Sequence, residues 1–118
     1  MRPTVLMVDD HDGFRARARV MLEDAGFDVV GEATDGATGI AAADRLQPDV
    51  VLLDIGLPDL DGFAVAARLR DTRAATRIVL ISGRDAEDYG GQVEHSVADG
   101  FIPKMDLSRE RLLEMLGP

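Results

Sequence analysis

The sequence predicts an α/β fold in which five parallel strands alternate with five helices. Short apolar runs that end in a polar or turn residue recur along the chain, separated by stretches in which apolar residues have helical spacing. The central run, VVLLD at residues 50–54, is apolar at every position before its aspartate. Such a run is typical of a strand that is covered on both faces. We therefore expect a parallel sheet with right-handed crossovers and helices on both faces.

The composition is that of one globular domain. The chain has 118 residues, of which 46% are hydrophobic and 30% charged, and this length has room for one core. No apolar run has the length of a membrane span or a signal peptide, so we expect no membrane association. The absence of cysteine is consistent with a cytoplasmic location. The formal net charge of -9 repels nucleic-acid phosphates, so we expect no direct nucleic-acid binding by this segment.

The N-terminal part of the chain predicts two strands that flank a helix. Residues 4–8 (TVLMV) form a short apolar run that reads as the first strand. In residues 12–25 apolar side chains recur with the period of an α-helix, and Gly26 is a typical helix terminator. Residues 27–33 (FDVVGEA) predict a second, weaker strand.

Two helices are predicted on either side of the central strand. Asp35 is a suitable N-cap for a helix of small residues that ends before Pro48. After the central strand, Pro58 and Gly62 are turn-forming residues that shape the return loop. Residues 63–70 carry apolar side chains at helical spacing and predict a short third helix.

The fourth strand is predicted at residues 77–81 (RIVLI), directly before Ser82. Residues 85–97 have helical spacing, but Gly90 and Gly91 lie inside this segment. Each glycine costs about 1 kcal/mol relative to alanine in a helix. We therefore expect a fourth helix over 85–97 that is the loosest element of the fold.

The C-terminal part of the chain predicts the last strand and the last helix. Residues 100–104 (GFIPK) read as the fifth strand. Pro103 favours an edge position for this strand because proline cannot donate a hydrogen bond to a neighbour. Ser108 is a suitable N-cap for the fifth helix, which we expect Gly117 and Pro118 to close.

Polar side chains occur at the ends of four predicted strands. They are Asp9 with Asp10, Asp54, Ser82 and Lys104. The carboxyl ends of parallel strands meet at one rim of a sheet, where open α/β proteins bind ligands. Three carboxylates brought together need a cation, and Mg²⁺ prefers oxygen ligands of this kind. Lysine and serine can bind phosphoryl oxygens beside such an ion, and a carboxylate can itself accept the phosphoryl group.

With this constellation the chain resembles the receiver domain of bacterial response regulators, in the chemotaxis-regulator-like superfamily of two-component signalling. The matching residues, in chain order, are Asp9, Asp10, Asp54, Pro58, Gly62, Ser82 and Lys104. The resemblance covers residues 4–116, and we treat residues 1–118 as one receiver domain. It implies a flavodoxin-like, doubly wound, five-stranded parallel sheet of order 2-1-3-4-5 with five helices.

The resemblance also implies a phosphorelay function with a defined metal site. Asp54 would be the phosphoacceptor, with a histidine kinase or phosphotransfer protein as the donor. Asp10 and Asp54 would bind Mg²⁺ directly, Asp9 would act largely through water, and the carbonyl of Gly56 would complete the protein ligands. The domain would assist its own phosphorylation and dephosphorylation without being a turnover enzyme. Lys104 would contact the phosphoryl group.

A switch is implied at two further residues. Ser82 would turn toward the phosphoryl oxygens on activation, and Phe101 would move inward into the space that Ser82 vacates. This is a population shift in the face made by the fourth helix, the fifth strand and the fifth helix, which partners or an output domain then read. A dimer that forms on phosphorylation is one such outcome.

Three positions depart from the common pattern of the family. Phe101 has no phenol hydroxyl, so a switch at this position must work by packing alone. Gly56 has no side chain to position or block an attacking water, so the lifetime of the phosphoaspartate cannot be read from it. Met105 follows Lys104 where many receivers have proline.

Other functions and contexts compete with this reading. A haloacid-dehalogenase-like phosphohydrolase also forms an aspartyl phosphate, but it carries a second aspartate where this chain has Gly56. A receiver that signals without phosphorylation usually lacks an acid or the lysine, and this chain keeps both. His11 fits a loop residue better than a transition-metal ligand, because one histidine among carboxylates is a weak metal signal. A single-domain regulator and a receiver cut from a longer chain with a helix-turn-helix output domain both remain open.

Overall fold

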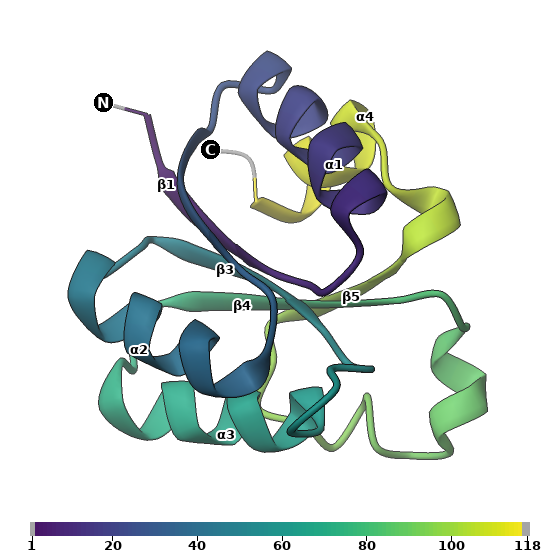
Figure 1. Ribbon diagram of the computed structural model, residues 1–118. Helices are drawn as coiled ribbons and strands as arrows, with labels where there is room; N and C mark the ends of the chain where they lie inside the picture. The colour runs from purple at the N-terminus through teal and green to yellow at the C-terminus, as the bar shows by residue number, and fades with distance from the viewer. Residues whose placement is uncertain (1, 117–118) are drawn as a thin grey trace.

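The computed structural model describes residues 2–116 and contains one five-stranded parallel sheet (Figure 1). The strand order is β2-β1-β3-β4-β5, as the family resemblance implies. The strands are β1 (Thr4–Val8), β2 (Asp28–Ala33), β3 (Val50–Asp54), β4 (Arg77–Ser82) and β5 (Gly100–Pro103). Every neighbouring pair is parallel, so all five carboxyl ends point the same way.

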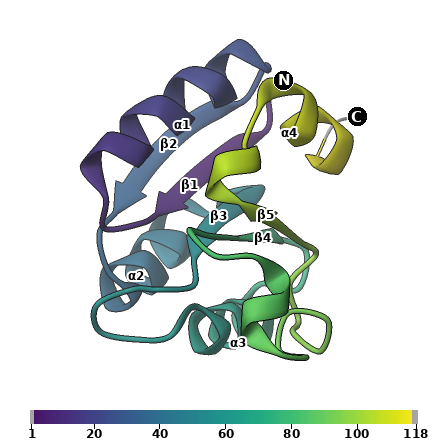
Figure 2. The ribbon, with the colours of Figure 1, turned by 90° about the vertical axis from the view of Figure 1, so that its right-hand side faces the viewer.

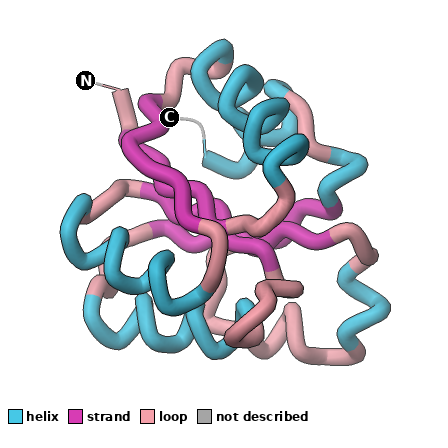
Figure 3. The backbone as a smooth tube through the Cα atoms, viewed as in Figure 1, coloured by secondary structure: helices cyan, strands magenta, loops and turns pink. Residues whose placement is uncertain are grey.

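Helices cover both faces of this sheet (Figures 2 and 3). The α-helices of the described chain are α1 (Asp12–Asp24), α2 (Gly36–Leu46), α3 (Gly62–Thr72) and α4 (Arg109–Leu116). Helices α1 and α4 lie on one face, and α2 and α3 lie on the other. No helix among residues 2–116 is long and apolar enough to cross a bilayer.

The central strand β3 confirms the prediction of a doubly covered sheet. Val50 and Leu52 pack into the core beneath α1 and α4, whereas Val51 and Leu53 pack into the core above α2 and α3. All four side chains are buried. Alternating residues of a strand point to opposite faces, so an apolar run without polar interruption is required here.

The predicted helix over residues 85–97 is wrong. The segment contains only η1, a single 3-10 turn at Ala86–Tyr89, and continues as turns. Gly90 has φ +61° and ψ -130°, a conformation that is open to glycine and that ends the helical path. The apolar spacing in this segment was therefore misleading, and the described residues contain four α-helices instead of five.

The C-terminal predictions are otherwise confirmed within the described residues. Strand β5 lies at a sheet edge, the position that Pro103 favours. The strand ends at this proline, so Lys104 opens the 3-10 turn η2 (Lys104–Asp106) instead of ending the strand. The Ser108 hydroxyl accepts a hydrogen bond from the backbone N–H of Arg111 at 3.0 Å, as an N-cap does. Residues 117–118 lie outside the described part of the chain.

Candidate functional site

The strand register brings the predicted site residues to one rim of the sheet. Val8 of β1 pairs with Leu53 of β3, so Asp9 and Asp54 are the next residues on two adjacent strands. In β4, Ile81 pairs with Asp54, which places Ser82 one residue beyond it. In β5, Pro103 pairs with Ser82, so Lys104 follows one residue beyond this pair. Parallel pairing alone therefore gathers two acids, a hydroxyl and a cation from four strands.

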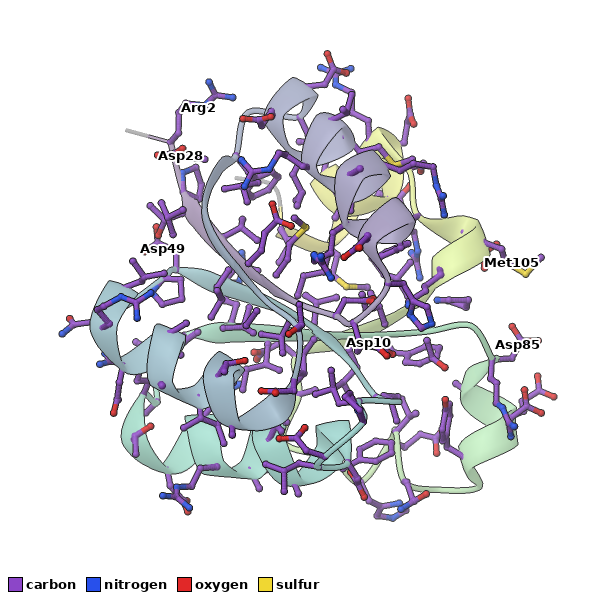
Figure 4. The ribbon with its side chains drawn as sticks, in the orientation of Figure 1. Arg2, Asp10, Asp28, Asp49, Asp85 and Met105 are labelled. Atoms are coloured by element: carbon purple, nitrogen blue, oxygen red, sulfur yellow. The ribbon has the colours of Figure 1, made fainter. Side chains whose placement is uncertain are left out.

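The two adjacent acids after β1 lie in different environments. Asp9 is 1% exposed and its Oδ1 accepts a hydrogen bond from the backbone N–H of His11 at 2.8 Å. Asp10 is exposed at the start of the loop that leads to α1 (Figure 4). One acid is therefore fixed in the rim of the sheet, while the other is open to solvent and to an incoming ligand.

Asp54 is a buried carboxylate, 3% exposed, at the end of the central strand. Its Oδ1 accepts a hydrogen bond from the backbone N–H of Gly56 at 3.1 Å, and its Oδ2 lies 3.4 Å from Lys104 Nζ. Burial raises the pKa of Asp54, and the neighbouring charge of Asp9 raises it further. The Gly56 N–H and the Lys104 ammonium oppose this shift because they stabilise the ionised form.

Lys104 connects the two buried carboxylates. Its Nζ lies 2.7 Å from Asp9 Oδ2 and 3.4 Å from Asp54 Oδ2. The same ammonium lies 4.6 Å from the ring centroid of Phe14, which holds it from the α1 side by a cation–π contact. The lysine thus reaches from the edge strand across the rim to the acids of the two central strands.

The acid cluster fits a hard divalent cation. Ligand atoms of Asp9, Asp10, His11 and Asp54 all lie within 4.8 Å of one another. Asp9 Oδ2 is buried and has no aligned hydrogen bond, because its contact with Lys104 has ion-pair distance without hydrogen-bond geometry. Two carboxylates are buried side by side, and burial together with the charge of Asp9 raises the pKa of Asp54. A cation with oxygen preference, such as Mg²⁺, would relieve both the orphaned oxygen and the repulsion.

His11 lies at this site, where the sequence favoured a simple loop residue. Its Nδ1 is 3.1 Å from Asp9 Oδ1, 3.2 Å from Asp10 Oδ1 and 3.8 Å from Asp54 Oδ2. The side chain remains 64% exposed, so the ring stands at the mouth of the cluster. Its position directly after the two aspartates was the signal that the sequence offered.

Ser82 is 3% exposed and has two partners. Its Oγ accepts a hydrogen bond from the backbone N–H of Arg84 at 3.0 Å and forms a second hydrogen bond with the hydroxyl of Tyr89. Sequence reasoning treated Tyr89 only as an apolar helix position. The available signal was that it is the one tyrosine of the chain.

Phe101, the other predicted switch residue, is half-buried on β5. Its ring packs edge-on against Tyr89, with ring centroids 6.4 Å apart and an angle of 69° between the planes. Tyr89 packs in the same manner against Phe63 of α3, at 5.8 Å and 74°. The two predicted switch residues therefore meet through a third side chain.

An open cavity of about 670 Å³ lies over the rim. Its lining includes Asp54, Gly56, Ser82, Lys104 and Tyr89. The predicted metal ligand Gly56 is exposed in the loop directly after β3, so this loop and the strand ends share one opening.

The loop after β3 is held by the neighbouring helices. The Asp59 carboxylate accepts hydrogen bonds from the backbone N–H groups of Gly36 at 2.7 Å and Ala37 at 3.0 Å, at the start of α2. These bonds lower the pKa of Asp59, with that from Gly36 contributing most. Asp61 caps α3 by accepting from Phe63 N–H at 2.6 Å. The loop that carries Gly56 is thus anchored beyond the site.

Comparison with known proteins places these residues in a family. The model of the response regulator receiver domain matches residues 5–117. A putative transcriptional regulator of Pseudomonas aeruginosa is 37% identical over 112 residues, which are 95% of this chain and 52% of that protein. The nitrate/nitrite response regulator protein NarL of Escherichia coli is 35% identical, over 96% of this chain and 52% of that protein. The chain spans about half the length of these curated relatives.

Solved structures show the same fold. The receiver domain of the putative response regulator NarL from Mycobacterium tuberculosis has a TM-score of 0.85 and 36% identity, covering 96% of this chain and 91% of that chain. The chemotaxis response regulator CheY4 of Vibrio cholerae has a TM-score of 0.83 and 27% identity, covering 98% and 97%. Both the sequence comparison and the structural comparison therefore relate this chain to receiver domains. The chain belongs to the response regulator receiver domain family of two-component systems.

Proposed function

We propose that Asp54 accepts a phosphoryl group from a phosphohistidine of a histidine kinase or phosphotransfer protein. The observation that carries this proposal is the position of Lys104 Nζ between two buried carboxylates, 2.7 Å from Asp9 and 3.4 Å from Asp54. In the transfer, an oxygen of Asp54 forms a bond to phosphorus while the bond from phosphorus to the histidine nitrogen breaks. The electron pair stays on the imidazole, which then takes up a proton.

The residues of the rim have separate roles in this transfer. Asp54 must be ionised to attack, and Lys104 together with the Gly56 N–H stabilises its ionised form. Asp10 and Asp54 are proposed to hold Mg²⁺ with the Gly56 carbonyl, and Asp9 to act on it largely through water. When bound, Mg²⁺ neutralises charge on the phosphoryl oxygens. Lys104 then binds one of those oxygens, which keeps the group in line with Asp54.

The phosphorylated state is proposed to act as a switch. Ser82 turns its hydroxyl toward a phosphoryl oxygen, and Phe101 moves into the vacated space. The domain is a signalling module by its family, and the absence of a carboxylate at Gly56 argues against a phosphohydrolase with turnover. The surface that changes lies around η1, β5 and α4.

We propose gene regulation as the output, because several relatives of the chain are transcription regulators. These relatives include the virulence factors putative positive transcription regulator BvgA of Bordetella pertussis, which is 38% identical over 85% of this chain and 48% of that protein. We propose that this receiver controls a DNA-binding output region in a longer cytoplasmic protein. The net charge of -9 makes this segment itself a poor ligand for DNA.

Intact-mass spectrometry after incubation with acetyl phosphate tests the acceptor function. The native chain is expected to gain one phosphoryl group when Mg²⁺ is present and none when the ion is chelated. The variant Asp54→Asn is expected to gain none under either condition. A native chain that stays unmodified, although a known receiver in the same tube reacts, would contradict acceptance from this small donor.

A further inference from the structure

Tyr89 contacts both predicted switch residues. Its hydroxyl forms a hydrogen bond with Ser82 Oγ, and its ring packs edge-on against Phe101 at 6.4 Å between centroids. Ser82 and Phe101 have no hydrogen bond to each other, since Phe101 has no polar side-chain atom. One side chain that comes from neither strand therefore joins the hydroxyl at the site to the aromatic ring on the edge strand.

The hydroxyl of Ser82 forms its hydrogen bonds with residues other than Asp54. Ser82 is buried, and its Oγ accepts from Arg84 N–H at 3.0 Å and forms a hydrogen bond with the phenol of the half-buried Tyr89. A serine hydroxyl has one hydrogen and two acceptor positions, and binding a phosphoryl oxygen requires that the hydrogen point at it. We expect a Ser82 hydroxyl that turns to a phosphoryl oxygen on Asp54 to give up its hydrogen bond to the Tyr89 phenol in the active orientation.

Tyr89 lies in a segment that can respond to this loss. It ends the single turn η1, and Gly90 with its φ of +61° follows directly. The backbone beyond is held by isolated turn bonds, such as the one from Gln92 N–H to Tyr89 O at 3.1 Å. A residue in such a segment shifts at lower cost than one inside a regular helix. Tyr89 also lines the open cavity over the rim, so there is space beside it.

We infer that Tyr89 is a positioning residue that holds Ser82 in its inactive orientation and transmits the movement of Ser82 to Phe101. This inference rests on the proposed phosphoacceptor function. Phe101 cannot form a side-chain hydrogen bond. In this inference Tyr89 of η1 forms the hydrogen bond on which the switch depends. The phenol favours the unphosphorylated state, and its hydrogen bond to Ser82 opposes activation.

Binding of beryllofluoride, an inert analogue of the phosphoryl group, tests this assignment by calorimetry with Mg²⁺ present. Tyr89→Phe removes the hydroxyl and keeps the ring packing. Its affinity is expected to rise about fivefold, the effect of losing one hydrogen bond with a net contribution of about 1 kcal/mol. Ser96→Ala is the matched control, because it removes a hydroxyl that bonds only Val93 O and Ala98 N–H in the same segment.

A double-variant cycle shows whether the effect passes through Ser82. Ser82→Ala binds beryllofluoride more weakly, and adding Tyr89→Phe to it is expected to change nothing further. The chain has one tyrosine and no tryptophan, so its emission reports Tyr89 alone. Beryllofluoride is expected to change this emission in the native protein and to leave it nearly unchanged in Ser82→Ala.

Two results would overturn the assignment. Equal or weaker binding by Tyr89→Phe, with the native chain binding normally, would show that the phenol does not restrain Ser82. The same gain of affinity in Ser96→Ala would show that loosening of the segment causes the effect. Failure of the native chain to bind beryllofluoride with Mg²⁺ is a different result, which would remove the phosphoacceptor function and this inference with it.

Discussion

The surroundings of Asp54 oppose its ionised form. Burial and the charge of Asp9 raise its pKa above the ordinary value. Folding therefore disfavours the carboxylate relative to the carboxylic acid. In the absence of a cation, the contribution of Asp54 to the free energy of unfolding becomes more favourable as the pH falls from neutral through its raised pKa. The same property makes the site a receptor for positive charge.

The variant Asp54→Asn is expected to unfold several degrees higher than the native chain at neutral pH with a chelator present. The substitution removes a buried charge and its repulsion from Asp9 while keeping the side-chain size. Thermal unfolding followed by circular dichroism measures this difference. Asp28→Asn serves as the control, because Asp28 is an exposed acid at the start of β2.

With Mg²⁺ present, the native chain should have a higher melting temperature than Asp54→Asn. The ion is expected to raise the melting temperature of the native chain by mass action and to have a much smaller effect on Asp54→Asn. A variant that melts lower than the native chain without Mg²⁺ would contradict the view that charge repulsion limits stability at this site.

Among the elements, the loop between β3 and α3 does most to fix the position of Asp54. A Cβ atom at Gly62 would lie 2.5 Å from Ile55 Cα and 2.6 Å from Asp54 O, so no side chain fits there. The Gly62 N–H donates to Ile55 O at 2.9 Å, which turns the chain back against the strand. The start of α3 therefore packs directly on the backbone that carries Asp54, the proposed phosphoacceptor.

Gly62→Ala is expected to reduce the free energy of unfolding by about 1–3 kcal/mol, the usual cost of overpacking a close contact. It should also slow modification by acetyl phosphate, since Asp54 must shift to admit the methyl group. Urea unfolding and the mass assay measure the two effects. The control Gly13→Ala places its methyl group 3.8 Å from Arg17 Nη1 in α1 and should not destabilise the protein. Equal stability of Gly62→Ala and the native chain would refute this role of the glycine.

The strands and four of the helices could be predicted because their signals are local. An apolar run such as VVLLD carries its burial pattern in its own letters, and capping by Asp35 and Ser108 depends on neighbours in sequence. The prediction of a helix over 85–97 was wrong because apolar spacing contains no information about the backbone conformation at Gly90. The contact of Tyr89 with Ser82 could not be predicted, since it depends on the irregular path that replaces this helix.

The site residues could be predicted as a set but not in their individual environments. That Asp9 is buried and Asp10 exposed follows from how the chain leaves β1, which the two adjacent letters do not reveal. The position of His11 among the carboxylates likewise depends on the path of this loop. Topology brought the residues together, and loop geometry decided what each one contacts.

In the whole molecule, two well-packed layers of core contrast with one irregular flank. The cores on the two faces of the sheet are made by α1 with α4 and by α2 with α3. The segment from Gly90 to Asp99 lacks a regular helix and is tied down by Arg70, which donates to Val97 O at 3.1 Å and to the Asp99 carboxylate at 2.7 Å. Met105, 84% exposed, points away from the body on the same side (Figure 4).

Amide hydrogen exchange should be fast in the irregular flank and slow in the two core layers. Amides of residues 90–97 are expected to exchange orders of magnitude faster than those of β3 and β4, because few of them are protected by regular hydrogen bonds. Deuterium uptake followed by peptide mass spectrometry measures this difference. Arg70→Met should speed exchange in 90–97 further and leave β3 unchanged. Protection of 90–97 equal to that of α3 would contradict an irregular flank.

The most direct test of the central claim is to locate the phosphoryl group on the chain. Borohydride reduces an aspartyl phosphate to homoserine, so treatment after acetyl phosphate and Mg²⁺ converts only the acceptor residue. Peptide sequencing by mass spectrometry can then examine each of the 22 acidic residues. Homoserine at position 54 alone is the expected result. Homoserine at another aspartate, or at none while the intact protein carries a phosphoryl group, would contradict Asp54 as the phosphoacceptor.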